Sequence, residues 1–226
     1  MLVKNWMSKE AVSVDANDSM TAATKMLKEY DIRMLPVMKH GKLVGVVTDR
    51  DLKRASASDA TTLEIHELLF LVSKIKVADI MTKDPLTVPP DYTIGETAEL
   101  LLDNKISGVP VVENGGRLVG VITEADVFRA IISLTGLQKK GVQFAFQLED
   151  RSGSINEVAD IIRNYGGSLA SILTSYEQVP EGYRKVYIRM YGVDRPNLQE
   201  LIEKLKATAP LLYMVDFREN IREVYE

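Results

Sequence analysis

A long internal repeat limits the fold of this chain more strongly than its composition does. The stretch LVGVVTDRDLKRA at residues 43–55 returns as LVGVITEADVFRA at 118–130. A shift of 74 residues, or 75 after a one-residue insertion in the second copy, aligns Met7 with Met81, Val14 with Val88, Ser19 with Thr93, Pro36 with Pro110, Gly45 with Gly120, Thr48 with Thr123 and Asp51 with Asp126. A repeat of this length indicates two copies of one structural unit.

Each copy predicts the same succession of elements. A short apolar strand, at 11–14 or 86–89, precedes a helix that an Asp or Ser can cap and that has apolar residues on one face. A strand then starts near Pro36 or Pro110, where a missing N–H is tolerated. The turn HGK or NGGR makes a hairpin with the strand LVGVVT or LVGVIT. A second helix begins just after Thr48 or Thr123.

The junction between that last strand and the second helix carries the chemistry of each copy. Gly45 or Gly120 leaves room for another group to approach the strand closely. The free N–H groups of a helix N-terminus attract a phosphate, and the Thr hydroxyl can also bind it. The Asp three residues after the Thr can accept two hydrogen bonds from the vicinal diol of a ribose. The same residues fit a capping box, with Thr as N-cap and Asp as the N3 acid, so both interpretations stay open.

The order of strand, helix, two strands and helix, with Pro-Val before the hairpin and the pattern G-h-h-T-x-x-D (h, apolar) after it, resembles the CBS domain. Two in tandem, over about residues 1–135, resemble a Bateman module. The resemblance implies two units paired about a pseudo-twofold axis, with clefts that bind AMP, ADP, ATP, S-adenosylmethionine or a related adenosyl ligand. It also implies roles for particular positions: Asp51 and Asp126 on ribose, Thr48 and Thr123 on phosphate, Ser13 and Thr87 lining the cleft, and, three residues before Pro36 and Pro110, Arg33 on phosphate but Ser107 in the second copy.

The two predicted clefts differ in charge. The first copy offers Arg33, Arg50 and Lys53, whereas the second has Ser107, Ala125 and Phe128 at the matching positions. Because a guanidinium makes strong bidentate contacts with phosphate, we expect one strong site and one that is weak or empty. The alternative, that Arg50 and Lys53 are solvated helix residues, stays open.

Residues 60–76, between the copies, predict a linker helix. Ile65, Leu68, Leu69 and Val72 follow the spacing of a helical stripe, and further apolar residues widen it. A helix that is apolar on more than one side is typical of burial between units or subunits, and the family resemblance implies dimers formed through helices. The sequence therefore predicts a homodimer.

Residues 140–226 predict a different unit, with the order βαββαβ that is typical of a ferredoxin-like fold. After the strand VQFAFQLED, Ser152 or Ser154 can cap a helix that Gly166-Gly167 ends. This part resembles the ACT domain, a small-molecule sensor often associated with amino-acid ligands. The D-x-P-G-x-L pattern of that family, with Ser for Pro and Ile for Leu, implies ligand candidates at Asp150, Ser152, Gly153, Ser154 and Ile155. The replaced Pro favours an interaction or dimerisation role.

We therefore expect an α+β protein with a first CBS unit at 1–59, the linker helix at 60–76, a second CBS unit at 77–135 and an ACT domain at 140–226. The order CBS–CBS–ACT resembles bacterial proteins of the acetoin-utilisation B type. That resemblance implies a regulator without a catalytic domain.

Composition argues against several function classes. A net charge of −4 gives no broad positive field for nucleic acid or an acidic membrane. The absence of cysteine excludes disulfides and thiolate metal sites, and two histidines and no P-loop argue against a metal centre or an enzyme. The start MLVKNWMSKEAV lacks the apolar core of a signal peptide, and no apolar run would span a membrane, so we expect a cytoplasmic protein.

The sequence thus predicts a sensor of an adenosyl ligand that signals to an unknown partner, with the ACT domain as second sensor or dimerisation module. Two alternatives stay open. One is a structural or assembly module with vestigial clefts, and the other is an amino-acid sensor that acts through the ACT domain.

Overall fold

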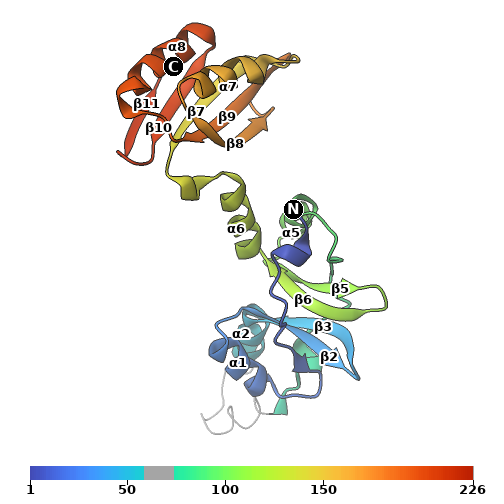
Figure 1. Ribbon diagram of the computed structural model, residues 1–226. Helices are drawn as coiled ribbons and strands as arrows, with labels where there is room; N and C mark the ends of the chain where they lie inside the picture. The colour runs from blue at the N-terminus through green and yellow to red at the C-terminus, as the bar shows by residue number, and fades with distance from the viewer. Residues whose placement is uncertain (59–73, 226) are drawn as a thin grey trace. The chain divides into compact units, whose positions relative to one another are not determined.

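The computed structural model describes residues 1–58 and 74–225. The chain forms two compact units, Met1–Ala130 and Ile131–Glu226, and the division falls within helix α6 (Glu124–Leu134). Figure 1 shows the elements of both units. The linker helix expected at 60–76 falls mainly on residues outside the described part. That helix, and the dimer argued from it, stay predictions.

The first copy of the repeat forms a sheet in the order β1-β2-β3-β4. Strand β1 (Val14–Asp15) pairs in parallel with β2 (Met34–Lys39), which forms an antiparallel hairpin with β3 (Lys42–Thr48). Helix α1 (Met20–Glu29) starts at Ser19, whose Oγ accepts a hydrogen bond from the N–H of Ala22 (3.1 Å). Helix α2 (Asp49–Ser58) follows β3 directly. The core between them includes Val14, Ala23, Leu27, Leu35 and Val47.

The second copy repeats these elements, and in both copies the first strand differs from the prediction: the strand expected at 11–14 is β1 at Val14–Asp15. The second copy contains α5 (Ile94–Asn104), the hairpin of β5 (Gly108–Glu113) and β6 (Arg117–Thr123), and α6. The strand expected at 86–89 is reduced to a parallel bridge between Val88 and Val111, where the first copy pairs Val14 with Val37. Prolines lack the N–H that a strand ladder uses, and three of them surround Val88: Pro85, Pro89 and Pro90.

The core of each copy includes residues from a segment that lies at the start of the other copy in the sequence. Residues 1–8, with the 3-10 helix Val3–Asn5, pack in the core of the second copy, and residues 75–83, with α4 (Val77–Ile80) and β4 (Thr82–Lys83), pack in the core of the first. The N–H of Val3 donates to the carbonyl oxygen of Tyr92 (2.8 Å), as that of Val77 does to Asp18 (2.9 Å). Figure 1 shows the N-terminus beside α5. We call residues 1–8 and 75–83 the exchanged segments, an arrangement that the expected ranges 1–59 and 77–135 do not include.

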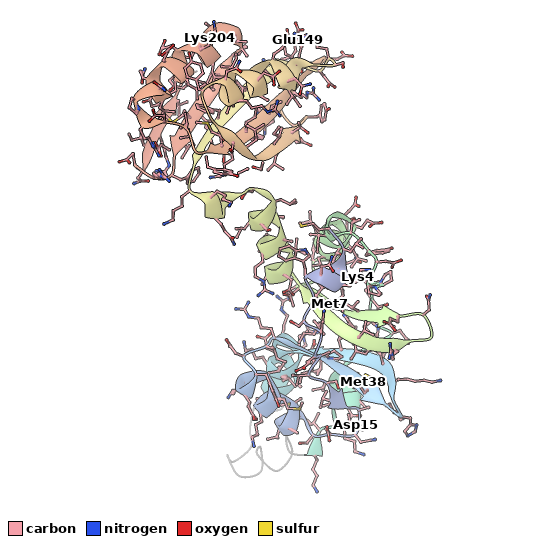
Figure 2. All side chains as sticks on the ribbon, viewed as in Figure 1. Lys4, Met7, Asp15, Met38, Glu149 and Lys204 are labelled. Atoms are coloured by element: carbon pink, nitrogen blue, oxygen red, sulfur yellow. The ribbon has the colours of Figure 1, made fainter. Side chains whose placement is uncertain are left out.

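The exchanged segments explain Gly45 and Gly120. A β-carbon on Gly45 would lie 2.8 Å from the carbonyl oxygen of Thr82, and one on Gly120 would lie 2.6 Å from that of Ser8. Met7, labelled in Figure 2, lies on the N-terminal segment beside β6, where Ser8 pairs with Val121. The close approach expected at these glycines is therefore made by the main chain of the exchanged segments.

The second unit has the expected order βαββαβ, followed by one strand that was not predicted. Its elements are β7 (Val142–Glu149), α7 (Ser154–Asn164), β8 (Ser168–Ser175), β9 (Tyr183–Tyr191), α8 (Leu198–Thr208), β10 (Leu211–Asp216) and the added β11 (Ile221–Val224), with 3-10 helices at Leu137–Lys139 and Arg195–Asn197. The antiparallel sheet has the order β11-β10-β7-β9-β8, and Figure 1 shows both helices on the same face. Residues of β11 are exposed, so no buried apolar pattern marks it in the sequence.

The prediction that Ser152 or Ser154 caps α7 is wrong. The N-cap is Gly153, whose φ of +88° makes the turn, and no side chain caps the helix. The hydroxyl of Ser154 instead donates to the carbonyl oxygen of Arg151 (3.1 Å). The expected end of the helix is confirmed, since Gly166 follows it with a φ of +77°.

Candidate functional site

In the first copy, Thr48 and Asp51 hold each other at the point where β3 ends and α2 begins. The N–H and the hydroxyl of Thr48 both donate to Oδ2 of Asp51, at 2.9 and 2.6 Å. The N–H of Asp51 donates back to Oγ1 of Thr48 (3.3 Å). Within the described residues, Oδ1 of Asp51 has no hydrogen-bond partner. This carboxylate therefore keeps one oxygen available beside the helix N-terminus.

The second copy reproduces this geometry between β6 and α6. The N–H and the hydroxyl of Thr123 donate to Oδ2 of Asp126 at 2.8 and 2.7 Å, and the N–H of Asp126 donates back at 3.4 Å. Asp126 is 3% exposed, and its Oδ1 accepts a hydrogen bond from the guanidinium of Arg129. The capping-box interpretation is confirmed in both copies. It uses Oδ2 alone, so the ribose interpretation of the aspartates remains a prediction.

The residues three before the prolines also lie at these junctions. The N–H of Asp49 donates to the carbonyl oxygen of Arg33 (3.1 Å), and the N–H of Glu124 donates to that of Ser107 (3.0 Å). The structure thus brings Arg33, Thr48, Arg50 and Asp51 to one strand end, and Ser107, Thr123 and Asp126 to the matching strand end of the second copy.

The other sequence candidates lie farther from the helix starts. Pro36 and Pro110 are buried in β2 and β5. Ser13 is half-buried just before Val14, and Thr87 is exposed just before Val88, so both precede the residues that pair with the next strand. Their role in lining a cleft stays a prediction.

The charge around the two junctions differs as the sequence indicates. In the first copy, Nζ of Lys53 lies 3.0 Å from Oδ2 of Asp49, and its hydrogen bond lowers the pKa of Asp49, with a smaller lowering from the positive charge of Arg33. Lys53 is 79% exposed in this pair, which supports its interpretation as a solvated helix residue. Arg33 and Arg50 are exposed and form no ion pair within the described residues. Within the described residues, the first junction therefore has two exposed guanidinium groups without an ion-pair partner.

Two of the five candidate ligand residues of the second unit, Asp150 and Ser154, contact Arg184. Oδ1 of Asp150 lies 3.3 Å from the guanidinium of Arg184, which also donates to Oγ of the buried Ser154 (3.1 Å). Ile155 packs against the core, and Ser152 and Gly153 are exposed. Sequence reasoning did not single out Arg184, which contacts both Asp150 and Ser154 although it lies 30 residues after Ser154 in the chain.

A cavity of about 280 Å³ adjoins this loop, and Ser154 is the one ligand candidate among its lining residues. Its lining includes the apolar residues Leu148, Val158, Ala209 and Pro210. Arg151 donates to both Glu149 (2.9 Å) and Glu157 (2.8 and 2.9 Å) at its rim, and the hydrogen bond from Arg151 lowers the pKa of Glu157. The cavity lining thus combines apolar residues with the charged side chains of Glu149, Arg151 and Glu157.

The family model of the CBS domain matches residues 3–58 and 77–133, which are the two copies of the repeat and half of the chain. The chain belongs to the CBS domain family. The tandem pair of CBS domains expected from the sequence is confirmed, and the Thr-Asp junctions described above are the strand-to-helix junctions of its two CBS domains.

Relatives and solved structures resemble the CBS part of the chain. A CBS domain-containing protein of Dictyostelium discoideum is 32% identical over 135 residues, which cover 59% of this chain and 93% of that protein. The CBS domain pair of protein MJ0100, solved in complex with 5′-methylthioadenosine and S-adenosyl-L-methionine, is 32% identical with a TM-score of 0.50, and the match covers 58% of this chain and 95% of that one. A structure from Vibrio cholerae that carries the name AcuB is 27% identical with a TM-score of 0.52, and the match covers 62% and 97% of the two chains.

The described residues lack the side-chain groups of a metal site and the helix of a membrane span. No group of three or more histidine, aspartate or glutamate side chains there is arranged to hold a metal ion. No helix in that part of the chain has the length and apolar character needed to cross a bilayer.

Proposed function

We propose that this CBS pair is the ligand-binding part of a regulatory sensor, which binds adenosyl compounds at its two Thr-Asp junctions and signals to a partner protein. The free Oδ1 of Asp51, held beside the N-terminus of α2, is the observation that carries the proposal. A carboxylate with a fixed orientation accepts hydrogen bonds from a ribose diol without further ordering, and the helix N-terminus attracts phosphate. The complex of the CBS pair of protein MJ0100 with two adenosyl compounds supports this ligand class.

The charge at each junction sets which adenosyl compound it prefers. The first junction combines the guanidinium groups of Arg33 and Arg50 with a helix N-terminus, which suits a ligand with phosphate. The second has Ser107 and Ala125 in their place and keeps the acidic Glu124. It therefore suits an uncharged or cationic adenosyl compound, or remains empty when nucleotides are the only ligands.

The second unit acts in this proposal as an ACT-type module that senses a second small molecule or joins two copies of the chain. Its βαββαβ order and the turn at Gly153 support the resemblance. The cavity beside Ser154 favours a small ligand with an apolar body and a charged group. The chemistry of the proposed sensor is binding, and we assign no catalytic residue.

The test is calorimetric titration of the full chain with ATP, AMP and 5′-methylthioadenosine. Asp51→Ala and Asp126→Ala each remove charge-assisted hydrogen bonds worth about 1.5–3 kcal/mol, so each should weaken one site about 10- to 150-fold. Loss of the capping box should also lower the free energy of unfolding by about 1 kcal/mol. Thermal shifts with a panel of amino acids examine the cavity of the second unit in the same preparation.

Glu96→Ala is the matched control, because Glu96 forms a capping box with Thr93 whose three hydrogen bonds (2.8, 2.6 and 3.2 Å) closely match those at Thr48. This variant should lose the two hydrogen bonds that the Glu96 carboxylate accepts from Thr93 and keep ligand affinity. Unchanged affinity for every adenosyl compound in both aspartate variants and in the double variant would favour the alternative, a structural or assembly module whose junctions only cap helices.

A further inference from the structure

The two aspartates of the CBS pair differ in one respect that the repeat does not predict. In Asp51 the capping box occupies Oδ2, and Oδ1 has no partner within the described residues. In Asp126 the capping box occupies Oδ2, and Arg129 occupies Oδ1. The oxygen proposed to accept the ribose is therefore free in the first copy and already bonded in the second.

The partner of Oδ1 comes from the same helix. Arg129 stands three residues after Asp126 on α6, a spacing that places the two side chains on one helix face. The Asp126 side chain is 4% exposed and that of Arg129 is 65% exposed, so the guanidinium covers the carboxylate from the solvent side. A group that approaches Oδ1 of Asp126 from solvent must therefore displace it.

The first copy has the same arginine without the same bond. Arg54 stands three residues after Asp51 on α2, is exposed, and forms no ion pair within the described residues. Spacing alone therefore does not produce the contact. Because the two arginines occupy equivalent positions in the repeat, Arg54 serves as a matched control for Arg129.

We propose that Arg129 is a specificity-determining residue that competes with the ligand for Asp126. The proposal rests on the adenosyl-binding function proposed above. Because the guanidinium of Arg129 covers Oδ1 of Asp126 from the solvent side, a ribose diol that approaches this oxygen displaces it. Binding at the second junction therefore includes the loss of an ion pair that the first junction does not have within the described residues. Arg129 should consequently raise the ligand concentration at which the second junction fills, a threshold that the first junction lacks.

The experiment uses the full chain with Asp51→Ala, which leaves the second junction as the site to be titrated. The probe is 5′-methylthioadenosine, which has a ribose diol and no phosphate, so a displaced Arg129 gains no new anionic partner from it. A partly exposed ion pair contributes at most about 1 kcal/mol, so Arg129→Gln should raise the affinity about 2- to 5-fold, whereas Arg54→Gln should leave it unchanged. A parallel titration with AMP covers the case in which the second junction requires a phosphate.

A salt series gives a second readout. Higher ionic strength weakens a partly exposed ion pair, so added NaCl should raise the affinity for the uncharged probe when Arg129 is present and have no such effect in Arg129→Gln. Unchanged affinity and an unchanged salt response in Arg129→Gln would overturn the proposal. Weaker binding in that variant would overturn it as well, because Arg129 would then contact the ligand.

The failure of the adenosyl-binding function looks different from these outcomes. If neither probe binds the unmodified chain, or if Asp51→Ala, Asp126→Ala and the double variant all leave the affinity for both probes unchanged, the function itself is wrong and the competition fails with it. If only Asp51→Ala weakens binding, the function stands at the first junction and the role of Arg129 is overturned. If binding depends on Asp126 while Arg129→Gln has no effect, the function stands and the role of Arg129 is overturned.

Discussion

The two CBS copies share a backbone and differ in charge. Both have the hairpin, the capping box at the second helix and a glycine against an exchanged segment, and these features depend on residues that occur in both copies. Arg33 and Arg50 of the first copy have no charged counterpart in Ser107 and Ala125 of the second. The residues that fix the backbone of a copy are thus separate from those that set the charge of its junction.

The exchanged segments show that neither copy folds its core from its own repeat alone. Val3 is fully buried in the core of the second copy and Val77 in that of the first. Ser8 pairs with Val121 as Thr82 pairs with Val46. The pair is therefore one folding unit, and damage to either glycine contact should affect both copies.

The largest effect should come from Gly45→Ala and Gly120→Ala. In both, the new β-carbon would lie closer than 3 Å to a main-chain oxygen of an exchanged segment, so the sheet or the segment must move. Overpacking of this kind costs about 1–3 kcal/mol. We expect similar losses of unfolding free energy for the two variants in urea titrations, because the contacts are equivalent.

Gly95→Ala is the control for this pair. Gly95 lies in α5, and its nearest group to an added β-carbon is Oγ1 of Thr93 at 3.9 Å. Alanine in a helix should stabilise the chain by about 0.5–1 kcal/mol relative to glycine. A clear loss at one repeat glycine and none at the other would mean that the two exchanged segments are not equivalent.

The repeat predicted the elements of the CBS pair well because buried strands and capped helices have local signals. It could not predict the exchange. A shift of 74 residues aligns Val3 with Val77 and so shows that the two residues are equivalent. The same alignment would result if each valine packed in the core of its own copy. The strand expected at 86–89 was also too long, because the effect of its flanking prolines depends on which N–H groups the neighbouring strand needs.

The candidate sites were predictable to a similar degree. The spacing of Thr and Asp predicted the capping boxes, and the family resemblance implied a place for Arg33 at the first junction, where its carbonyl oxygen accepts from the N–H of Asp49. The bond between Arg129 and Asp126 was not predicted, since Arg54 has the same spacing from Asp51 without an ion pair in the described part of the chain. In the second unit, the sequence pattern located the loop at Asp150, but not its contact with Arg184 on another strand.

Arg33→Ala should have the next largest effect and tests the charge difference directly. Loss of a guanidinium contact with phosphate should weaken the affinity of the first junction for ATP about 10-fold and that for adenosine little, because a charge-assisted hydrogen bond contributes about 1.5 kcal/mol or more. The ATP affinity of the unmodified chain should fall with added salt more steeply than that of the variant. Calorimetry at two ionic strengths measures both.

The reciprocal variant Ser107→Arg adds the guanidinium to the second copy, where Ser107 has the same main-chain contact with the start of its helix. It should raise the affinity of that junction for ATP, while Ser107→Ala should change little. Equal losses for ATP and adenosine in Arg33→Ala would show that Arg33 does not face a phosphate. The charge difference between the copies would then have no consequence for ligand choice.

The smallest effect should be on the stability that the chain loses at low pH, and it depends on the start of the first helix in each copy. Hydrogen bonds from Thr93 lower the pKa of Glu96 from its usual 4.5, and Glu96 belongs to the capping box of α5. The corresponding position in α1 is Ala22, so Ser19 caps that helix without an acidic partner. A carboxyl group with a lowered pKa in the folded state adds stability above its unfolded pKa, and that stability is lost as the pH falls through the folded value.

Glu96→Ala should therefore reduce the stability lost in acid, whereas Ala22→Glu should increase it by adding a second capping-box acid. Urea titrations at neutral pH and at about pH 3 measure the difference. If Glu96→Ala loses as much stability in acid as the unmodified chain, other carboxyl groups account for the acid response. The presence of Glu96 in α5 and of Ala22 in α1 then changes the hydrogen bonds at the helix start without changing the stability in acid.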